Sequence, residues 1–257
     1  MQNLFSMDGK TVLIVGGAGY LGLPVCEALR AQGASVVIGD HHPGRLAEAQ
    51  ATLAGQPGAG EVTTCHVDMA DESSILACVD SCGTLHGLVM ATAGSSNTHF
   101  DKLTAEEYDR SNRINLTGTF VLARAAASKM TEGGAMVFYS SMYGTVAPDP
   151  ANYPGDMPPN PVDYGAGKAG ISQMARYVAG HFGRRGIRVN AITPGPFPPQ
   201  AVQDVHPEFI ANLTRDTMMG RMGRRHETAG AVVFLLSEAA SYITGQILGV
   251  DGGWTAW

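Results

Sequence analysis

The sequence has few cysteines, and they lack the spacing of a metal or redox motif. Only four cysteines occur in 257 residues, and no two of them form a CxxC pair. This number is low for a chain held together by disulfides, so we expect reduced thiols in a cytoplasmic protein. The eight histidines show no HExxH spacing. We therefore expect no metal site.

Long hydrophobic runs and basic stretches are also missing. The first apolar segment, Val12–Val15, is too short for a signal peptide or a membrane span. The 17 Lys and Arg residues are outnumbered by 23 Asp and Glu residues, which gives a net charge of −6. Nucleic-acid binding needs clustered positive charge. We therefore expect neither a nucleic-acid nor a membrane partner, and instead a small-molecule substrate.

Short β-branched runs alternate with longer amphipathic stretches along the whole chain. The expected strands are residues 11–15, 35–39, 61–67, 87–91, 135–140, 187–192 and 246–250. Nearly continuous apolar strands separated by helices indicate a parallel sheet covered on both faces. No repeat or linker divides the chain. The pattern predicts one α/β domain over residues 1–257, a doubly wound parallel sheet of about seven strands.

Proline is concentrated in two stretches. Six of the 14 prolines lie between Pro148 and Pro161, and four more lie between Pro194 and Pro199. Proline breaks helices and cannot donate to a strand ladder, so both stretches are expected to be loops. Each follows the carboxyl end of a predicted strand, where open α/β sheets place their ligands. We expect residues 144–162 and 194–222 to border the substrate.

A glycine-rich turn, VGGAGYLG, follows the first predicted strand and opens the first helix. Gly16, Gly19 and Gly22 are spaced three apart, a pattern that permits a tight turn and close approach of a pyrophosphate. The unpaired N–H groups of the helix N-terminus would then face the phosphates. The turn, including Tyr20 and Leu21, predicts a dinucleotide site, and a simple strand-to-helix turn is the alternative.

Two acidic residues end the second and third predicted strands. Asp40 stands 24 residues after Gly16, where a carboxylate can bind the adenosine ribose hydroxyls and would repel a 2′-phosphate. This favours NAD, with NADP less favoured, although Arg45 and two neighbouring histidines leave room for NADP. Asp68, followed by Met69, could reach the adenine amino group. Either carboxylate could instead be an exposed turn residue.

The stretch YGAGK places a phenol, Tyr164, and an ammonium, Lys168, one helical turn apart. A free phenol has a pKa of about 10 and is a poor base at neutral pH. A nearby cation lowers that pKa and brings it closer to the range useful for proton transfer. The pair therefore predicts a general acid/base, and both side chains could also face a nicotinamide ribose.

With these motifs in this order, the sequence resembles the short-chain dehydrogenase/reductase family over nearly its whole length. The resemblance is carried by the glycine turn, Asp40, Asp68 and YGAGK, together with the stretches RINLTG, FYSSMYG, RVNAITPG and ITGQILGVDGG. It implies a Rossmann-like fold and an NAD(P)-dependent dehydrogenase or reductase acting on CH–OH groups. It also implies a homo-oligomer, a dimer or tetramer, often paired through the helices around residues 104–131 and 162–184.

The resemblance further implies the roles of individual residues. Tyr164 would be the general acid/base with Lys168 as its partner, Ser141 would bind the substrate oxygen, and Asn115 would hold a water in a proton relay. Without the family, Asn115 could equally be a helix residue bonded to the backbone, and Ser141 a cap at a strand end. The remaining expected cofactor contacts are Ala93, Gly94, Pro194, Gly195 and Phe197.

Three features depart from the compact branch of this family. The glycine spacing and the 23-residue separation of Ser141 from Tyr164 resemble the longer sugar-nucleotide branch. The turn ATAG, at residues 91–94, replaces an Asn-Asn-Ala-Gly turn, and its loss is expected to loosen the fourth strand. The C-terminal third follows the compact pattern. We therefore expect a compact dehydrogenase with an enlarged substrate rim.

Polar residues in the two crevice loops favour a sugar, sugar acid or polyol as substrate, unless they are only solvated surface. They are Asp149, Asn152, Tyr153, Asp156, Asn160, Ser95, Ser96, Asn97 and His99. Methionines in residues 209–222 could instead cover an apolar substrate or pack against the scaffold. The competing hypotheses are a sugar-nucleotide epimerase or dehydratase, a 3-oxoacyl or steroid-type carbonyl reductase, and a non-catalytic NAD-binding protein.

Overall fold

The structure, a computed structural model, describes residues 3–56, 58, 60–131 and 133–257. Seven strands form one sheet in the order β3-β2-β1-β4-β5-β6-β7, and every pair is parallel. The strands are β1 (Thr11–Val15), β2 (Ser35–Asp40), β3 (Val62–His66), β4 (Gly87–Met90), β5 (Gly134–Tyr139), β6 (Ile187–Pro194) and β7 (Ile247–Val250). The predicted doubly wound parallel sheet is confirmed, with strand ends within two residues of those expected.

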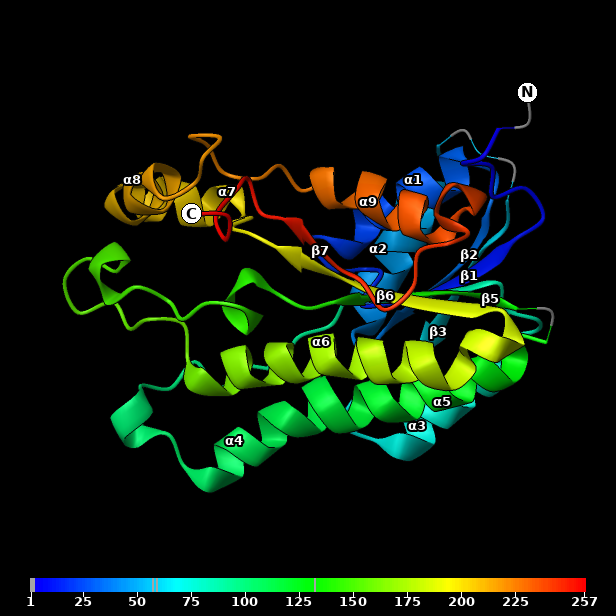
Figure 1. Cartoon of the computed structure of the whole chain (residues 1–257), viewed down its shortest axis with the longest axis horizontal. Coiled ribbons are helices and arrows are strands. Elements are labelled where there is room, and N and C mark those ends of the chain that lie inside the picture. The colour runs from blue at the N-terminus through cyan, green and yellow to red at the C-terminus, as the bar shows by residue number, and fades with distance from the viewer. Residues whose placement is uncertain (1–2, 57, 59, 132) are drawn as a thin grey trace.

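Helices cover both faces of the sheet (Figure 1). One face carries α1 (Gly22–Ala31), α2 (Pro43–Ala54) and α9 (Glu227–Leu236). The other carries α3 (Glu72–Ser81), α4 (Ala105–Asn112), α5 (Thr119–Lys129) and α6 (Val162–Phe182). Short helical turns occupy Phe100–Lys102, Met142–Gly144, Gly183–Arg185 and Glu238–Ala240. Within the described residues, every helix is too short or too polar to cross a bilayer.

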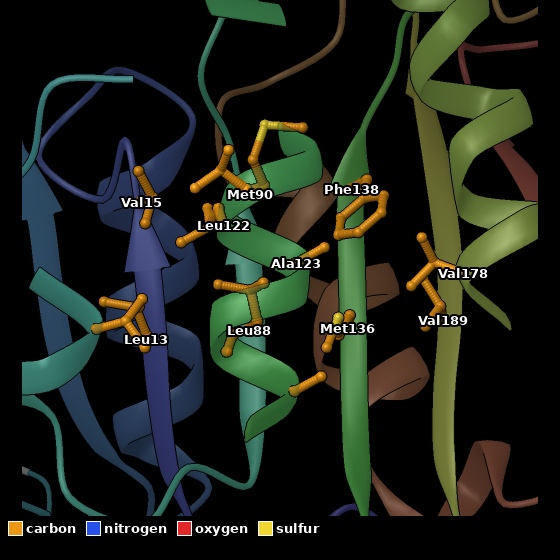
Figure 2. Packing of buried hydrophobic residues seen from close by; sticks show 14 of the residues in the cluster. Leu13, Val15, Leu88, Met90, Leu122, Ala123, Met136, Phe138, Val178 and Val189 are labelled. Carbon is orange, nitrogen blue, oxygen red and sulfur yellow. The ribbon is translucent and has the colours of Figure 1, made fainter. Parts of the chain in front are cut away.

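The largest apolar cluster lies between the central strands and the α5–α6 layer (Figure 2). Leu88 and Phe138 are fully buried and face the α5 side chains Leu122 and Ala123. Each large aliphatic or aromatic side chain buried in this way contributes about 1.5–3 kcal/mol of transfer free energy. The packing holds the carboxyl ends of β4 and β5 in fixed positions, and the site is built there.

A π-helical turn, η2 (Arg113–Gly118), joins α4 to α5. Such turns are rare and mark places where a helix is widened to aim a side chain. Gly118 leaves no room for a side chain, because an added Cβ would meet the carbonyl oxygen of Met69. The turn holds Asn115 almost completely buried next to the end of β4. No local pattern in residues 113–118 predicted this widened turn.

Both proline-rich stretches lie at the carboxyl end of the sheet, as expected. The first contains the short turn η4 (Pro150–Asn152), and the second leads into α7 (Gln200–Val205) and α8 (Pro207–Arg215). Figure 1 shows these segments at the same end of the molecule as the C-terminus. They therefore form the rim around the carboxyl ends of the central strands.

The expectation of four reduced cysteines is wrong for two of them. Cys65 on β3 and Cys78 on α3 form a disulfide, with Cα atoms 5.8 Å apart. Cys26 and Cys82 are free and buried, and burial raises the pKa of the Cys26 thiol to about 12. The spacing gave no signal because the pair is brought together only by the packing of α3 on β3. Cys65 lies two residues before the Val67–Met69 segment in the sequence.

Candidate active site

The strand order reverses between β1 and β4, and the glycine turn lies at this point. Gly16 adopts a left-handed φ of +81°, and a Cβ there would lie 2.7 Å from the carbonyl oxygen of Ala91. Gly22 packs so closely on the Gly16 carbonyl that a side chain has no space. Helix α1 begins at Gly22 with no side-chain cap and no acidic residue in its first turn. The Leu23 amide is bonded to the Gly19 carbonyl at 3.1 Å, and the positive end of the helix faces the turn, where it favours an anion such as a pyrophosphate.

A cavity of about 320 Å³ lies beside this turn. Its lining combines the glycine turn with the ends of β2, β3 and β4: Val15, Gly16, Gly19, Asp40, His41, Arg45, Val67, Asp68, Met69, Ala91, Thr92, Ala93 and Ile114. Asp40 and Asp68 face the same space, as predicted. The Asp68 Oδ1 also accepts a hydrogen bond from the Ala70 amide at 2.8 Å, which fixes its loop.

Asp40 is buried at the end of β2 and already bears local hydrogen bonds. Its Oδ1 accepts from the His42 amide at 3.1 Å and from the Arg45 guanidinium at 3.0 Å. His41 Nδ1 lies 3.4 Å from the same oxygen. Arg45 thus stands next to the position that a ribose 2′-oxygen would take. The pairing brings a cation to the carboxylate that was expected to exclude a 2′-phosphate.

A second cavity, of about 250 Å³, shares Ala91, Thr92 and Ala93 with the first. Its other lining residues come from the glycine turn, β5, α6 and the loop after β6: Leu21, Tyr139, Ser140, Ser141, Tyr164, Lys168, Pro194, Gly195 and Phe197. Three of the four predicted catalytic residues therefore share one space. The two adjoining cavities and the glycine turn fit a nicotinamide dinucleotide, with the nicotinamide half beside Tyr164.

Lys168 is anchored by backbone carbonyls from the ends of two strands. Its Nζ donates to the carbonyl oxygen of Tyr139 at 2.8 Å and to that of Thr92 at 3.0 Å. Burial lowers the pKa of Lys168 to about 7. The ammonium lies 5.6 Å from the centre of the Tyr164 ring. The helix therefore presents both groups to the crevice, as their spacing predicted.

The acidity of Tyr164 differs from the expectation. Burial raises the pKa of Tyr164, and the hydrogen bond with Ser141 opposes this effect. Since Lys168 is largely desolvated, burial and Ser141 are the dominant influences on the phenol. Ser141 Oγ also accepts a hydrogen bond from the Tyr143 amide at 3.2 Å, so that Ser141 caps the turn after β5 as well. Because the Ser141 bond lowers the pKa of Tyr164, the single hydroxyl proton of Ser141 is directed at the phenol oxygen, the position next to which a substrate oxygen would bind.

Asn115 lies outside both cavities, and its side chain is bonded to the backbone. Its Oδ1 accepts from the Gly94 amide at 2.8 Å, and its Nδ2 donates to the Gly94 carbonyl at 2.9 Å. Its own carbonyl accepts from Thr119 Oγ1 at 2.6 Å. The side chain therefore holds the turn after β4, as the alternative interpretation of this residue predicted. These two hydrogen bonds connect the turn after β4 to Asn115, and the expected loosening of β4 stays a prediction.

Several predicted contacts line neither cavity. Tyr20 is 38% exposed and lies under the guanidinium of Arg225, 5.7 Å from its ring centre. Gly22 and Gly94 serve backbone packing instead. Thr92 was missed, although it lines both cavities and accepts from Lys168. Its place in the middle of ATAG is the signal that could have found it.

Much of the polar set in the 144–162 loop is used to build the loop itself. Asn152 is fully buried, and its Nδ2 donates to Asp216 Oδ2 at 2.6 Å, at the end of α8. Asp149 caps η4 through the Ala151 amide at 2.9 Å. Asn152 and Asp149 therefore both have structural roles within the chain. The hydroxyls of Tyr143 and Tyr153 are 2.9 Å apart.

Met218 and Met219 lie next to the C-terminal glycines and are 49% and 61% exposed. The Met219 amide donates to the Gly252 carbonyl at 3.0 Å, and a Cβ on Gly253 would meet the side chain of Met218. In the described part of the chain, no group of three or more histidine, cysteine, aspartate or glutamate side chains is placed to hold a metal ion.

The fold and site define a dinucleotide-dependent oxidoreductase, and comparisons with known proteins agree. A family model described as "Enoyl-(Acyl carrier protein) reductase" matches residues 18–255. The galactitol 2-dehydrogenase (L-tagatose-forming) of Cereibacter sphaeroides is 30% identical, with 100% of this chain and 99% of the relative covered.

Two solved structures have the same fold over almost their whole length. A short-chain type dehydrogenase/reductase from Mycobacterium marinum is 27% identical, with a TM-score of 0.88 and coverage of 99% and 98%. A gluconate 5-dehydrogenase from Burkholderia cenocepacia J2315, in complex with NADP and tartrate, is 26% identical, with a TM-score of 0.87 and coverage of 99% and 98%.

The chain belongs to the short-chain dehydrogenase/reductase family, and the predicted class of NAD(P)-dependent oxidoreductase acting on alcohol groups is confirmed. The ranking of NADP below NAD is not supported, since a solved relative carries NADP.

Proposed function

We propose that this protein transfers a hydride between a nicotinamide coenzyme and a secondary alcohol or ketone of a small polyhydroxylated substrate. The observation that carries the proposal is the convergence of Ser141, Tyr164 and Lys168 in one cavity next to the glycine turn. A protein that only bound a dinucleotide would have no need for a hydrogen-bonded serine–tyrosine pair at the nicotinamide end.

The roles of the catalytic residues follow from their contacts. A bound nicotinamide would supply or accept the hydride. Ser141 would donate its hydroxyl proton to the substrate oxygen and hold it next to Tyr164. Tyr164 would give its phenolic proton to that oxygen during reduction and take it back during oxidation. Lys168, held at the ends of β4 and β5, would favour the phenolate when protonated and would bind the ribose.

Asn115 is proposed as a positioning residue and not as part of a water relay. Its amide group and its carbonyl oxygen are all bonded to Gly94 or Thr119. By holding Gly94, Asn115 would fix the position of the Ala91–Ala93 segment, which lines both cavities. This role explains the need for an amide, which can donate and accept at once.

Both NAD and NADP are proposed as coenzymes. The Asp40 carboxylate supports NAD, because it could accept hydrogen bonds from the ribose hydroxyls. Arg45, which is bonded to Asp40, supports NADP, because its guanidinium could pair with a 2′-phosphate. The relative strength of these two contacts would set the ratio of the two activities.

The substrate class is supported by the polar lining and by the relatives. Ser95, Asn97 and His99 are exposed after β4, and the hydroxyls of Tyr143 and Tyr153 form a hydrogen bond within the segment that follows Ser141. Relatives named for galactitol and gluconate oxidation have nearly the same length as this chain. A sugar alcohol or sugar acid is therefore the first substrate class to test.

The test is turnover of a panel of sugar alcohols, sugar acids and their ketones, followed by the absorbance of the reduced coenzyme, with wild type and Tyr164→Phe. We expect wild-type activity on at least one member. The variant should lose about 10³-fold or more in kcat while it binds coenzyme normally, because only the proton donor is removed. Unchanged kcat in the variant would overturn the role of Tyr164. Coenzyme binding without turnover of any alcohol would favour a binding protein.

The homo-oligomeric state, dimer or tetramer, and the cytoplasmic location remain predictions. So does the assignment of residues 1–257 to one domain with two substrate loops. Light scattering after size-exclusion chromatography would measure the oligomer.

A further inference from the structure

The residue before Tyr164 is a fully buried carboxylate. Asp163 lies in the first turn of α6, and none of its side chain is exposed. Its Oδ2 accepts from the Ser96 amide and its Oδ1 from the Ser96 hydroxyl, both at 2.8 Å. A hydrogen bond from the Ser111 side chain on α4 adds a third donor and helps to hold the pKa of Asp163 below its usual value. Burying a carboxylate costs free energy unless hydrogen bonds such as these replace its contacts with water.

Asp163 fastens the loop that follows β4, which runs over residues 94–98. Its inward side chains are engaged: Ser96 with Asp163, and Thr98 with Glu107 Oε1 at 3.1 Å. The alternate residues Ser95 and Asn97 are exposed, and Asn97 has a left-handed φ of +56°. The loop therefore presents one polar row outward while the other is fixed to α4 and α6.

A second attachment lies one helical turn further along α6. Gly167 has no room for a side chain, because an added Cβ would lie 2.8 Å from the amide nitrogen of Asn115. Asn115 in turn holds both backbone groups of Gly94. Asp163 and Gly167 are separated by four residues, so they lie on one face of α6. Tyr164 and Lys168 lie on the neighbouring face with the same spacing. Asp163 and Gly167 thus fix the position of the loop along α6, the helix that carries Tyr164.

We infer that Asp163 is a positioning residue for substrate specificity: it fixes the 94–98 loop relative to Tyr164, so that Ser95 and Asn97 meet the substrate hydroxyls remote from the reacting carbon. The inference rests on the proposed function. Without the carboxylate, Ser96 loses both acceptors and the loop is held only at Gly94 and Thr98. The catalytic groups stay in place, since Ser141, Tyr164 and Lys168 make no contact with Asp163 side-chain oxygens.

The variants are Asp163→Ala, Asp163→Asn and Ser96→Ala. In Asp163→Ala, we expect KM for the best alcohol of the panel to rise about 10- to 100-fold, because charge-assisted bonds to the loop are lost. The kcat and the dissociation constant of the coenzyme should change less than about threefold. Asp163→Asn keeps an acceptor for the Ser96 amide and a donor for its hydroxyl, so it should restore most of the affinity.

The matched control is Ser73→Ala. Ser73 donates its amide and its hydroxyl to Asp71 Oδ1 at 2.9 and 2.8 Å, which repeats the serine–aspartate contact at the start of α3. We expect Ser96→Ala, but not Ser73→Ala, to raise KM. Hydrogen–deuterium exchange adds a measurement that needs no turnover, and faster exchange confined to residues 94–98 in Asp163→Ala is expected.

The outcomes separate this inference from the proposed function. If no alcohol is turned over by wild type, the proposed function fails, and the exchange measurement still decides whether Asp163 holds the loop. If KM is unchanged in Asp163→Ala, or if kcat, coenzyme affinity and thermal stability all fall together, the positioning role is refuted. If Asp163→Ala does not fold, Ser96→Ala decides: an unchanged KM refutes the role, and a raised KM supports it.

Discussion

The Nζ of Lys168 lies 2.8 Å from the carbonyl oxygen of Tyr139 and reaches it from one helical turn beyond Tyr164. Together with the Thr92 carbonyl at 3.0 Å, this contact joins α6 to the carboxyl ends of β5 and β4. Lys168, the residue proposed to assist proton transfer, therefore also connects the helix to the sheet. Its replacement should affect stability as well as chemistry.

The first prediction concerns how the contribution of Lys168 to stability depends on pH. Burial lowers the pKa of Lys168 to about 7 from an unfolded value of 10.5. Between these two values the unfolded chain binds more protons than the folded chain, so the Lys168 contribution to stability rises with pH. We expect the thermal stability of wild type, relative to Lys168→Met, to increase from pH 7 to pH 10. Melting curves of both proteins across this range measure the difference. A constant difference would contradict the shifted pKa.

The second prediction concerns the glycine turn. Gly16→Ala should weaken coenzyme binding by about 10-fold or more, because the Cβ pushes Ala91 into the cavity and costs about 1–2 kcal/mol in a left-handed conformation. Gly9→Ala is the matched control, since Gly9 has a φ of +70° but open space where the Cβ would lie. The control should lose stability without losing coenzyme affinity, as measured by fluorescence titration. Equal binding losses in both variants would assign the effect to backbone strain alone.

The third prediction concerns the choice of coenzyme. Arg45→Ala should reduce kcat/KM with NADP about 10-fold and leave the value with NAD nearly unchanged, because only the 2′-phosphate needs the cation. Asp40→Ser should have the opposite selectivity and favour NADP. Initial rates with both coenzymes measure the ratio. An Arg45→Ala enzyme with an unchanged ratio would remove Arg45 from the coenzyme site.

The fourth prediction concerns the contact between the two substrate loops. Asn152→Ala should destabilise the fold by about 1–3 kcal/mol, because it leaves Asp216 Oδ2 without its donor and removes an acceptor of Arg215. It should also raise KM, since α8 loses its attachment to the 144–162 loop. Asn212→Ala, which removes a 3.3 Å bond to the Asn152 carbonyl and an exposed 3.5 Å bond from Arg215, is the milder control. Equal losses in both variants would argue against the Asn152–Asp216 contact as the main attachment.

The strands and the two cavities could be predicted from the sequence because they depend on local patterns. The apolar run Val12–Val15 and the glycines after it specify a strand and a turn by themselves. Asp40 could be placed at the dinucleotide cavity because it ends the next strand, and parallel strands end on the same edge.

The parts that were missed depend on contacts between distant segments. No local signal shows that Asn115 is bonded to Gly94, that Cys65 meets Cys78, or that Asp163 holds Ser96. The acidity of Tyr164 was misjudged for a related reason. The helical spacing places Lys168 on the same side of α6 as Tyr164. The pKa values of the two groups also depend on how deeply they are buried, and the burial of Lys168 is set by β4 and β5, which lie outside the YGAGK motif.

The π turn of η2 has a consequence for how this chain can change in length. One additional residue in a helix rotates everything beyond it by about 100° relative to the preceding turns. In this structure α4 packs on α6, and α5 packs on α3, α6 and β4. Deleting a single residue from Arg113–Gly118 would restore a regular helix and turn the buried face of α5 toward water. A surface loop would tolerate the same deletion, whereas here one backbone unit determines which side of a helix meets the sheet.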